Sequence, residues 1–189
     1  MTEKTSYDVD LLVIGAGSGG VRCARIAAGH GAKVAVVESR EWGGTCVNLG
    51  CVPKKLMVQA SEYGDHVADS HGFGWDTQAG ACHWETLIAA KDREIARLNG
   101  IYVSMLEKAG VRLLTGFASF EDAHTVVIAP SELAPDATPE RITAERIVIA
   151  TGSTPSRLEI AGAELAITSD EVFALKDMPA RVCIIGGGY

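Results

Sequence analysis

The chain has 189 residues, a formal net charge of −7, 47% hydrophobic residues and 22% charged residues. This length suits one or two domains, and this composition predicts a packed, soluble core. The acidic balance disfavours a nucleic acid as partner, because phosphate binding requires a basic face. The apolar runs are too short to span a membrane and the N-terminus does not resemble a secretory signal, so we expect a cytoplasmic protein.

The N-terminal part of the sequence predicts a βαβ unit. The apolar run at residues 9–14, closed by a glycine, is typical of a buried parallel strand. A helix is expected over residues 17–29 and a second apolar strand at residues 33–38. Two strands joined by a helix in this way form the unit from which parallel α/β sheets are built, so we expect an α/β fold.

The middle of the chain is expected to be helical. A helix should begin near Thr45, whereas residues 64–82 follow no clear pattern. Apolar residues at helical spacing predict a helix over residues 83–110. Gly100 lies within this stretch and could bend the helix or divide it in two.

Three β-type runs, separated by polar turns, follow the helical part. They predict a small antiparallel insertion that returns to the main sheet. The runs are residues 111–120, 124–129 and 141–150.

The last residues, RVCIIGGGY at 181–189, again predict an apolar strand followed by glycines. Such a turn should open a helix, so we interpret the chain as an N-terminal fragment of a longer protein. We divide it into a first domain at residues 1–155 and, at residues 156–189, a return segment with the start of a truncated second domain.

The segment Gly15–Gly20 contains the G-x-G-x-x-G pattern of dinucleotide-binding turns. Gly15 would allow the tight turn, Gly17 would let a pyrophosphate approach the backbone, and Gly20 would let the helix pack on the strand. Glu38 lies eighteen residues after Gly20, near the separation expected of a carboxylate that binds ribose hydroxyls. A glycine-rich turn with a solvated glutamate is the alternative, but the flanking strand and helix favour a dinucleotide site.

Cys46 and Cys51 are separated by four residues in a chain with five cysteines. Zinc sites use C-x-x-C pairs with a second ligand pair, which this sequence lacks, so we expect no metal. Cα atoms five residues apart on an ideal helix are roughly 8.5 Å apart, whereas a disulfide requires less than about 7 Å. A Cys46–Cys51 bridge would therefore need a locally opened helix, with Gly50 supplying the backbone freedom.

A bridge in an opened helix is more easily reduced than a relaxed one, and a cytoplasmic protein gains little from a structural cross-link. Redox catalysis is therefore the better interpretation of the two cysteines. The helix start and the charges of Lys54 and Lys55 are expected to lower the thiol pKa and to favour thiolate.

Residues 43–55 read GGTCVNLGCVPKK and resemble the active-site segment of the FAD-dependent pyridine nucleotide–disulfide oxidoreductases. The ending CVPKK is similar to the glutathione and trypanothione reductases of that family rather than to dihydrolipoamide dehydrogenases, which typically read CIPSK. The resemblance covers the whole chain, including the glycine turn and the segments RLNGIY, GFASF, IVIATGSTP and CIIGGGY. It implies a Rossmann-like FAD-binding domain with βαβ units, a parallel sheet and a small antiparallel β-meander insertion.

The resemblance implies that the bound dinucleotide is FAD. Its pyrophosphate would lie at the glycine turn, its ribose at Glu38 and its adenine near the backbone of Ala118. Lys54 matches a lysine beside flavin N5, and Tyr189 matches a tyrosine that covers the flavin where nicotinamide docks. The implied FAD contacts are Gly15, Gly17, Ser18, Gly19, Gly20, Glu38, Gly44, Thr45, Cys46, Cys51, Lys54, Ala118, Thr151, Gly152 and Tyr189.

The resemblance also implies an NADPH-dependent glutathione-disulfide reductase in which Cys46, Cys51 and Lys54 are catalytic. Electrons would pass from NADPH through FAD to the Cys46–Cys51 disulfide. Cys46 would then attack glutathione disulfide as the outer thiol, and Cys51 would resolve the mixed disulfide.

Substrate choice is predicted from the charge of the first helix. Glutathione disulfide is anionic, and the resemblance places Arg25 at one of its glycyl carboxylates, with Arg22 one turn earlier on a similar face. Trypanothione reductases carry an acidic residue at the position of Arg22, so the basic residue here favours glutathione. Ser18 is also expected to touch the substrate. Tyr102 matches a tyrosine that packs against glutathione, with a core aromatic as the alternative.

The NADPH site would lie mostly beyond residue 189, together with a His–Glu pair that the family takes from the partner subunit of a homodimer. The chain alone should then lack NADPH-dependent turnover. A mercuric or other flavin disulfide reductase and a non-catalytic FAD-binding module remain alternatives. A structural Rossmann-like interaction protein is disfavoured, because a scaffold needs none of Cys46, Cys51 and Lys54.

Overall fold

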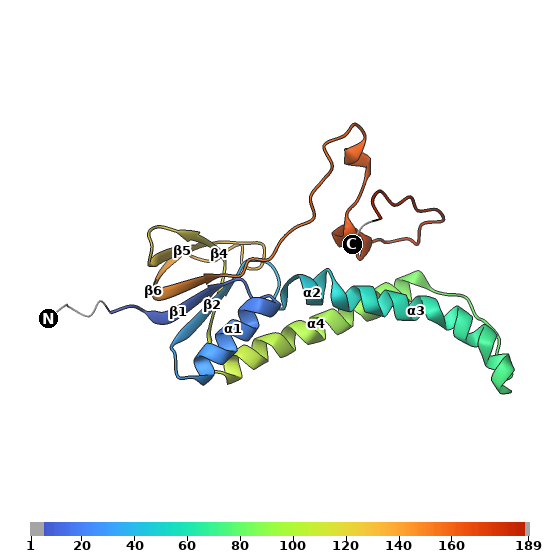
Figure 1. Ribbon diagram of the computed structural model, residues 1–189, viewed down its shortest axis with the longest axis horizontal. Coiled ribbons are helices and arrows are strands. Elements are labelled where there is room, and N and C mark those ends of the chain that lie inside the picture. Colours follow the sequence, from blue (N-terminus) through green and yellow to red (C-terminus); the bar gives the residue numbers. More distant parts are fainter. Residues whose placement is uncertain (1–5, 188–189) are drawn as a thin grey trace.

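The computed structural model describes residues 6–187, which contain a six-stranded sheet at one end of the molecule (Figure 1). The strands follow the order β3-β2-β1-β6-β5-β4. The pairs among β3, β2, β1 and β6 are parallel, whereas β5 and β4 are added antiparallel. The strands are β1 (Val9–Ile14), β2 (Val34–Glu38), β3 (Arg112–Thr115), β4 (Phe117–Phe120), β5 (Thr125–Ala129) and β6 (Glu140–Ile149). The α/β fold with its parallel sheet and antiparallel insertion is confirmed.

Strand β6 joins the two parts of the sheet. Its residues 144–149 pair in parallel with β1, and its residues 140–143 pair antiparallel with β5. The insertion is therefore anchored through one long strand, and the carboxyl end of β6 lies next to the carboxyl end of β1. In open parallel sheets, ligands bind in the crevice at these carboxyl ends.

Both faces of the parallel sheet are buried. Leu12 of β1 packs in one cluster with Ile142 of β6. The adjacent Val13 packs on the other face with Val21 of helix α1 and Leu106 of helix α4. Because helices cover one face and the antiparallel strands cover the other, β1 and β2 read as continuous apolar runs rather than alternating ones.

Two long helices, α3 and α4, lie side by side and extend away from the sheet (Figure 1). Gly100 lies inside an unbroken α4, so a division of this helix at Gly100 is wrong. One glycine costs a helix only roughly 1 kcal/mol relative to alanine, which a long packed helix tolerates. The helices are α1 (Ser18–Gly29), α2 (Gly44–Asn48), α3 (Cys51–Ser70), α4 (Trp84–Lys108) and α5 (Ser169–Val172), with 3₁₀ turns at His71–Phe73 and Ala163–Leu165.

The segment after β6 lacks the strand that the sequence predicts at residues 181–185. Val182, Ile184 and Ile185 are 69%, 82% and 66% exposed. A strand needs a neighbour for its backbone hydrogen bonds, and within residues 6–187 none of the six strands lies beside this run. The division into domains at residues 155 and 156 stays a prediction.

The return segment is instead held against α4 by two side chains. Lys91 Nζ donates to the carbonyl oxygen of Phe173 over 2.7 Å, and Trp84 Nε1 donates to that of Leu175 over 2.9 Å. Lys91 is only 5% exposed and also contacts Asp92 Oδ1 at 2.6 Å.

Over the described residues, the helices are all too short or too polar to cross a membrane.

Candidate active site

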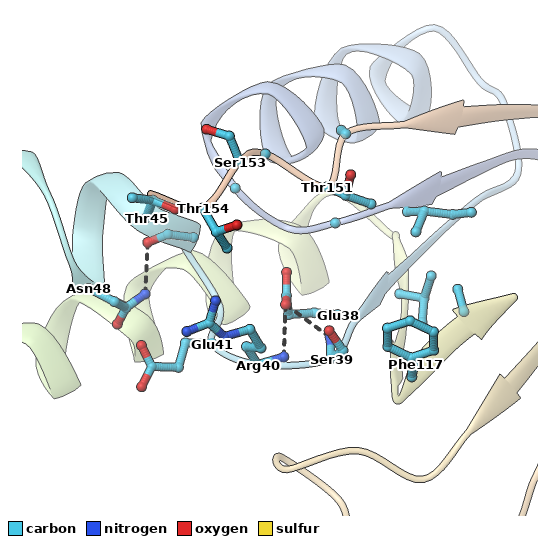
Figure 2. Close-up of a pocket in the computed structure, with 18 of the residues that line it drawn as sticks. Glu38, Ser39, Arg40, Glu41, Thr45, Asn48, Phe117, Thr151, Ser153 and Thr154 are labelled. Carbon is cyan, nitrogen blue, oxygen red and sulfur yellow. Dashed lines mark hydrogen bonds between the residues drawn. The ribbon is translucent and has the colours of Figure 1, made fainter. Parts of the chain in front are cut away.

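A cleft lies at the carboxyl ends of β1, β2 and β6, between the glycine turn after β1 and the start of α2 (Figure 2). It extends along the loop after β2 to the turn between β3 and β4. The predicted FAD-contacting residues that line this cleft are Gly15, Gly17, Glu38, Gly44, Thr45, Ala118, Thr151 and Gly152. The fold thus gathers residues that are up to 137 positions apart in the sequence into one cleft.

The turn after β1 requires glycine at position 15. Gly15 has φ +102, and a Cβ there would lie 2.3 Å from the carbonyl oxygen of Ala150. The Gly15 amide donates to Val37 O over 2.8 Å, and the Ala150 amide donates to Ile14 O over 2.8 Å. The backbones of β1, β2 and β6 therefore close together at the base of the cleft, and a side chain would force them apart.

Helix α1 packs tightly on this turn through Gly20. A Cβ on Gly20 would lie 1.9 Å from the carbonyl oxygen of Gly15. Gly17 is the N-cap of α1. A Cβ added to Gly17 would have only Gly44 Cα within 4 Å, at 3.8 Å, so the space beside this residue is open. The close helix–strand packing that the sequence predicts for Gly20 is therefore present in the geometry.

The N-termini of α1 and α2 meet at the cleft. Both helices have a glycine at the N-cap and no acidic residue in the first turn. The amides of Gly43 and Gly44 at the start of α2 already donate to Ala16 O and Glu41 O, so an anion would be attracted mainly by the N-terminus of α1 with its positive dipole end. A helix of twelve residues such as α1 presents a full set of such amides. A pyrophosphate placed here would be bound by backbone rather than by a cationic side chain.

The buried carboxylate of Glu38 connects the glycine turn with the loop after β2. Its Oε1 accepts hydrogen bonds from the amides of Ser39 and Arg40, both at 2.9 Å (Figure 2). Its Oε2 accepts from the amide of Ala16 at 2.7 Å. A carboxylate offers about four acceptor sites, so these three bonds leave capacity for a ribose hydroxyl. Glu38 is 9% exposed and lines the cleft.

The cleft also contains residues that sequence reasoning missed. Arg40 and Glu41 lie two and three residues after Glu38, and Asn48 ends α2. Arg40 and Glu41 belong to no motif and come to the cleft through the path of the loop after β2. Asn48 lies within the segment at residues 43–55, but no role at the cleft was predicted for it. The missed residues are Ile14, Val37, Ser39, Arg40, Glu41, Asn48, Leu49, Gly116, Phe117, Ser153 and Thr154.

The helix that carries the cysteines is opened between them, as the sequence predicts. Helix α2 ends at Asn48, Gly50 has φ −149 and ψ −111, and α3 begins at Cys51. A Cβ on Gly50 would lie 2.9 Å from the carbonyl oxygen of Thr45 and 3.3 Å from Cys46 Cα. The break therefore folds back on the turn that carries Cys46, and only glycine fits this approach.

Both cysteines are thiols in the structure, Cys46 half-buried and Cys51 exposed. A side-chain hydrogen bond with Cys51 raises the pKa of the Cys46 thiol above its ordinary value, and burial and the charge of Cys51 act in the same direction. Lys55 acts in the opposite direction but is outweighed. For Cys46, the lowered thiol pKa predicted from the helix start is wrong, because the second sulfur is the stronger neighbour.

The other predicted residues that lie within residues 6–187 do not line the cleft. Ser18, Arg22 and Arg25 are exposed on α1, and Lys54 is exposed on the first turn of α3. Tyr102 of α4 is partly buried and packs against the core cluster of α1, so the geometry contains the core contact that was the alternative for this residue. Gly19 is exposed at the start of α1, and Tyr189 lies outside the described residues.

The model of the family described as pyridine nucleotide-disulphide oxidoreductase matches residues 9–189. The chain belongs to this family. It is 52% identical to the glutathione reductase of Burkholderia cepacia over 97% of this chain and 39% of the relative. It is 45% identical to the glutathione reductase of Nostoc sp. (97% of this chain, 38% of the relative) and 45% identical to the trypanothione reductase of Leishmania donovani (95% and 39%).

The chain spans about 39% of the length of the curated relatives it matches. The identity to the trypanothione reductase, 45%, equals that to the Nostoc sp. glutathione reductase and is lower than the 52% to the Burkholderia cepacia glutathione reductase.

Proposed function

We propose that the chain is the FAD-binding, dithiol-bearing part of an NADPH-dependent glutathione-disulfide reductase. The observation that carries this proposal is the opened helix at Gly50, which brings the Cys46 and Cys51 thiols together directly after Thr45, a residue that lines the dinucleotide cleft. A structural cross-link would not require this arrangement, since the thiols and the cleft could then lie anywhere in the fold.

The residues of the cleft suit FAD. The N-terminus of α1 would hold its pyrophosphate, Glu38 would accept from its ribose, and the backbone at Ala118 and Thr151 would border its ends. Bound FAD would supply the electron pair that reduces the Cys46–Cys51 disulfide. Lys54 is proposed to offer its positive charge to the flavin, and Tyr189 to cover it.

The two thiols then perform thiol–disulfide exchange. Cys46, after losing its proton, attacks one sulfur of glutathione disulfide, forms a mixed disulfide and releases one glutathione thiolate. Cys51 attacks the sulfur of Cys46 and releases the second glutathione, so the pair ends as a disulfide. Because the pKa of Cys46 is raised by its partner, the reaction needs a base or a higher pH to produce the attacking thiolate.

Charge on α1 supports an anionic substrate. Arg22 and Arg25 are both exposed, three residues apart on one helix face, and thus free to meet carboxylates. Ser18 and Tyr102 are proposed as further contacts with glutathione. The cytoplasm as compartment, NADPH as donor and a homodimer as assembly belong to the same proposal.

The proposal is tested by the absorbance of the purified chain with FAD, before and after one equivalent of a dithiol. We expect bound flavin and a new long-wavelength band on reduction, absent in a Cys51→Ser variant. Bound flavin without the band would indicate a non-catalytic FAD-binding module, and absence of bound flavin in the full-length protein would contradict the FAD assignment. Reduction of glutathione disulfide but not of trypanothione disulfide or mercuric ion by the full-length protein would establish the substrate.

A further inference from the structure

A pair of asparagine side chains connects the short helix α2 to the long helix α4. Asn48 is 6% exposed, and its Nδ2 donates to Gly44 O at 3.0 Å (Figure 2). The same Nδ2 donates to Trp42 O at 3.4 Å. With its amide nitrogen facing Asn48, Asn99 of α4 donates to Asn48 Oδ1 at 3.0 Å and to Trp42 O at 2.9 Å. These bonds tie both ends of α2 to a helix that begins far away in the sequence.

The position of this pair relative to the cysteines gives it a chemical consequence. Asn48 lies between Cys46 and Cys51 and is the last residue of α2 before the break at Gly50. Helix α2 has five residues, too few to hold its shape by its own hydrogen bonds. Its orientation must therefore come from outside, and the Asn99 contact is an anchor from a 25-residue helix.

We propose that Asn99, acting through Asn48, is a positioning residue that sets the redox equilibrium of the Cys46–Cys51 pair. The inference rests on the proposed function only in taking these two cysteines as a redox pair. Neither asparagine touches a reacting sulfur in this role. They act by holding the turn that carries Cys46 in the place where Cys51 can reach it.

The physical basis is the cost of ring closure. Oxidation joins the two sulfurs and releases two protons and two electrons, which reduce an external disulfide such as oxidised dithiothreitol to its dithiol. If the turn is already held in place, little conformational freedom is lost on closure. Without the Asn99 amide, Asn48 Oδ1 and Trp42 O lose a donor, the turn gains freedom in the dithiol form, and the disulfide becomes less favourable.

Asn99→Ala tests this inference with few side effects. Asn99 is partly exposed on a helix, where alanine is well tolerated, and it does not line the cleft, whereas Asn48 does. Gly100→Ala is the matched control, because Gly100 is the next residue on α4 and a Cβ there has nothing within 4 Å. The chain is equilibrated with dithiothreitol at graded ratios of its two forms, thiols are trapped by alkylation, and the Cys46–Cys51 peptides are quantified by mass spectrometry.

We expect the equilibrium constant for oxidation of the pair to fall about tenfold in Asn99→Ala, or about 30 mV for a two-electron couple, and to stay unchanged in Gly100→Ala. An unchanged or increased constant in Asn99→Ala, even with a lowered melting temperature, would overturn the inference and leave Asn99 a structural contact only. If the parent chain itself forms no Cys46–Cys51 disulfide at any ratio, the proposed function and the inference both fail. If the parent forms it and only the variant comparison fails, the proposed function stands alone.

Discussion

The backbones of Gly17 and Gly44 meet where the first helix of the dinucleotide unit faces the helix that carries Cys46. A Cβ on Gly44 would lie 2.5 Å from Gly17 Cα, and Gly44 has φ +64. Both the space and the conformation at position 44 therefore require glycine. This contact joins the predicted cofactor turn to the redox segment without any side chain between them.

The variant Gly44→Ala should separate these two backbones. We expect a loss of about 1–3 kcal/mol in the free energy of unfolding, from the close contact and the left-handed backbone. FAD affinity should fall at least tenfold, because the two helix N-termini move apart. Urea unfolding and flavin fluorescence titration measure these effects. Gly64→Ala, in the open on α3, is the control, and an equal loss there would contradict the explanation.

The variant Glu38→Gln should weaken the link between the glycine turn and the loop after β2. Glutamine has one acceptor oxygen, and its amide NH2 group would face a backbone N–H. The hydrogen bonds from the amides of Ala16 and Ser39, which use different carboxylate oxygens, therefore cannot both remain. We expect a loss of about 1–3 kcal/mol in unfolding free energy and weaker FAD binding. Glu62→Gln on the exposed face of α3 should leave both unchanged. Wild-type stability and flavin binding in Glu38→Gln would show that the carboxylate is dispensable.

The reactivity of Cys46 should depend on pH in a direction set by its neighbours. Because the folded pKa of Cys46 is raised, the thiol form contributes stability at low pH, and this contribution is lost as pH rises through the folded pKa. Cys51→Ala should lower the pKa of Cys46 and speed its alkylation by iodoacetamide near neutral pH. Lys55→Gln should raise the pKa and slow the reaction. Shifts in the same direction for both variants would contradict this account.

The variant Lys91→Met should release the return segment from α4. The Lys91 ammonium donates to Phe173 O, and methionine keeps the apolar stem but loses the donor. We expect trypsin to cleave after Lys176 about tenfold faster, because the local opening costs less free energy once this bond is gone. Arg93→Met, at an exposed position on the same helix, is the control. Equal cleavage rates in Lys91→Met and the parent would rule out a holding role for Lys91.

Much of the fold follows from local patterns in the sequence. The apolar runs at β1 and β2, the glycine turn between β1 and α1 and the opened helix at Gly50 were all predicted, because each depends on residues that are close neighbours in the chain. The strand predicted at residues 181–185 was wrong, since a strand depends on a partner that lies elsewhere. Whether the helix continues through Gly100 could not be predicted for a related reason. The cost of a glycine in a helix is local, whereas the packing of α4 that outweighs this cost involves residues far away in the sequence.

The sequence by itself determined the family and the chemical parts: a turn that only glycine can form, a carboxylate at the end of the second strand and two cysteines at a spacing that requires an opened helix. Only the tertiary structure decided how these parts are held. Asn99 reaches Asn48 and Lys91 reaches Phe173 O through contacts that span 51 and 82 positions of the chain. No periodic pattern of residues in the sequence predicts such contacts, because they depend on the path of the whole backbone. The direction of the Cys46 pKa shift was likewise decided by the side-chain interaction with Cys51 and by burial, which the spacing alone does not specify.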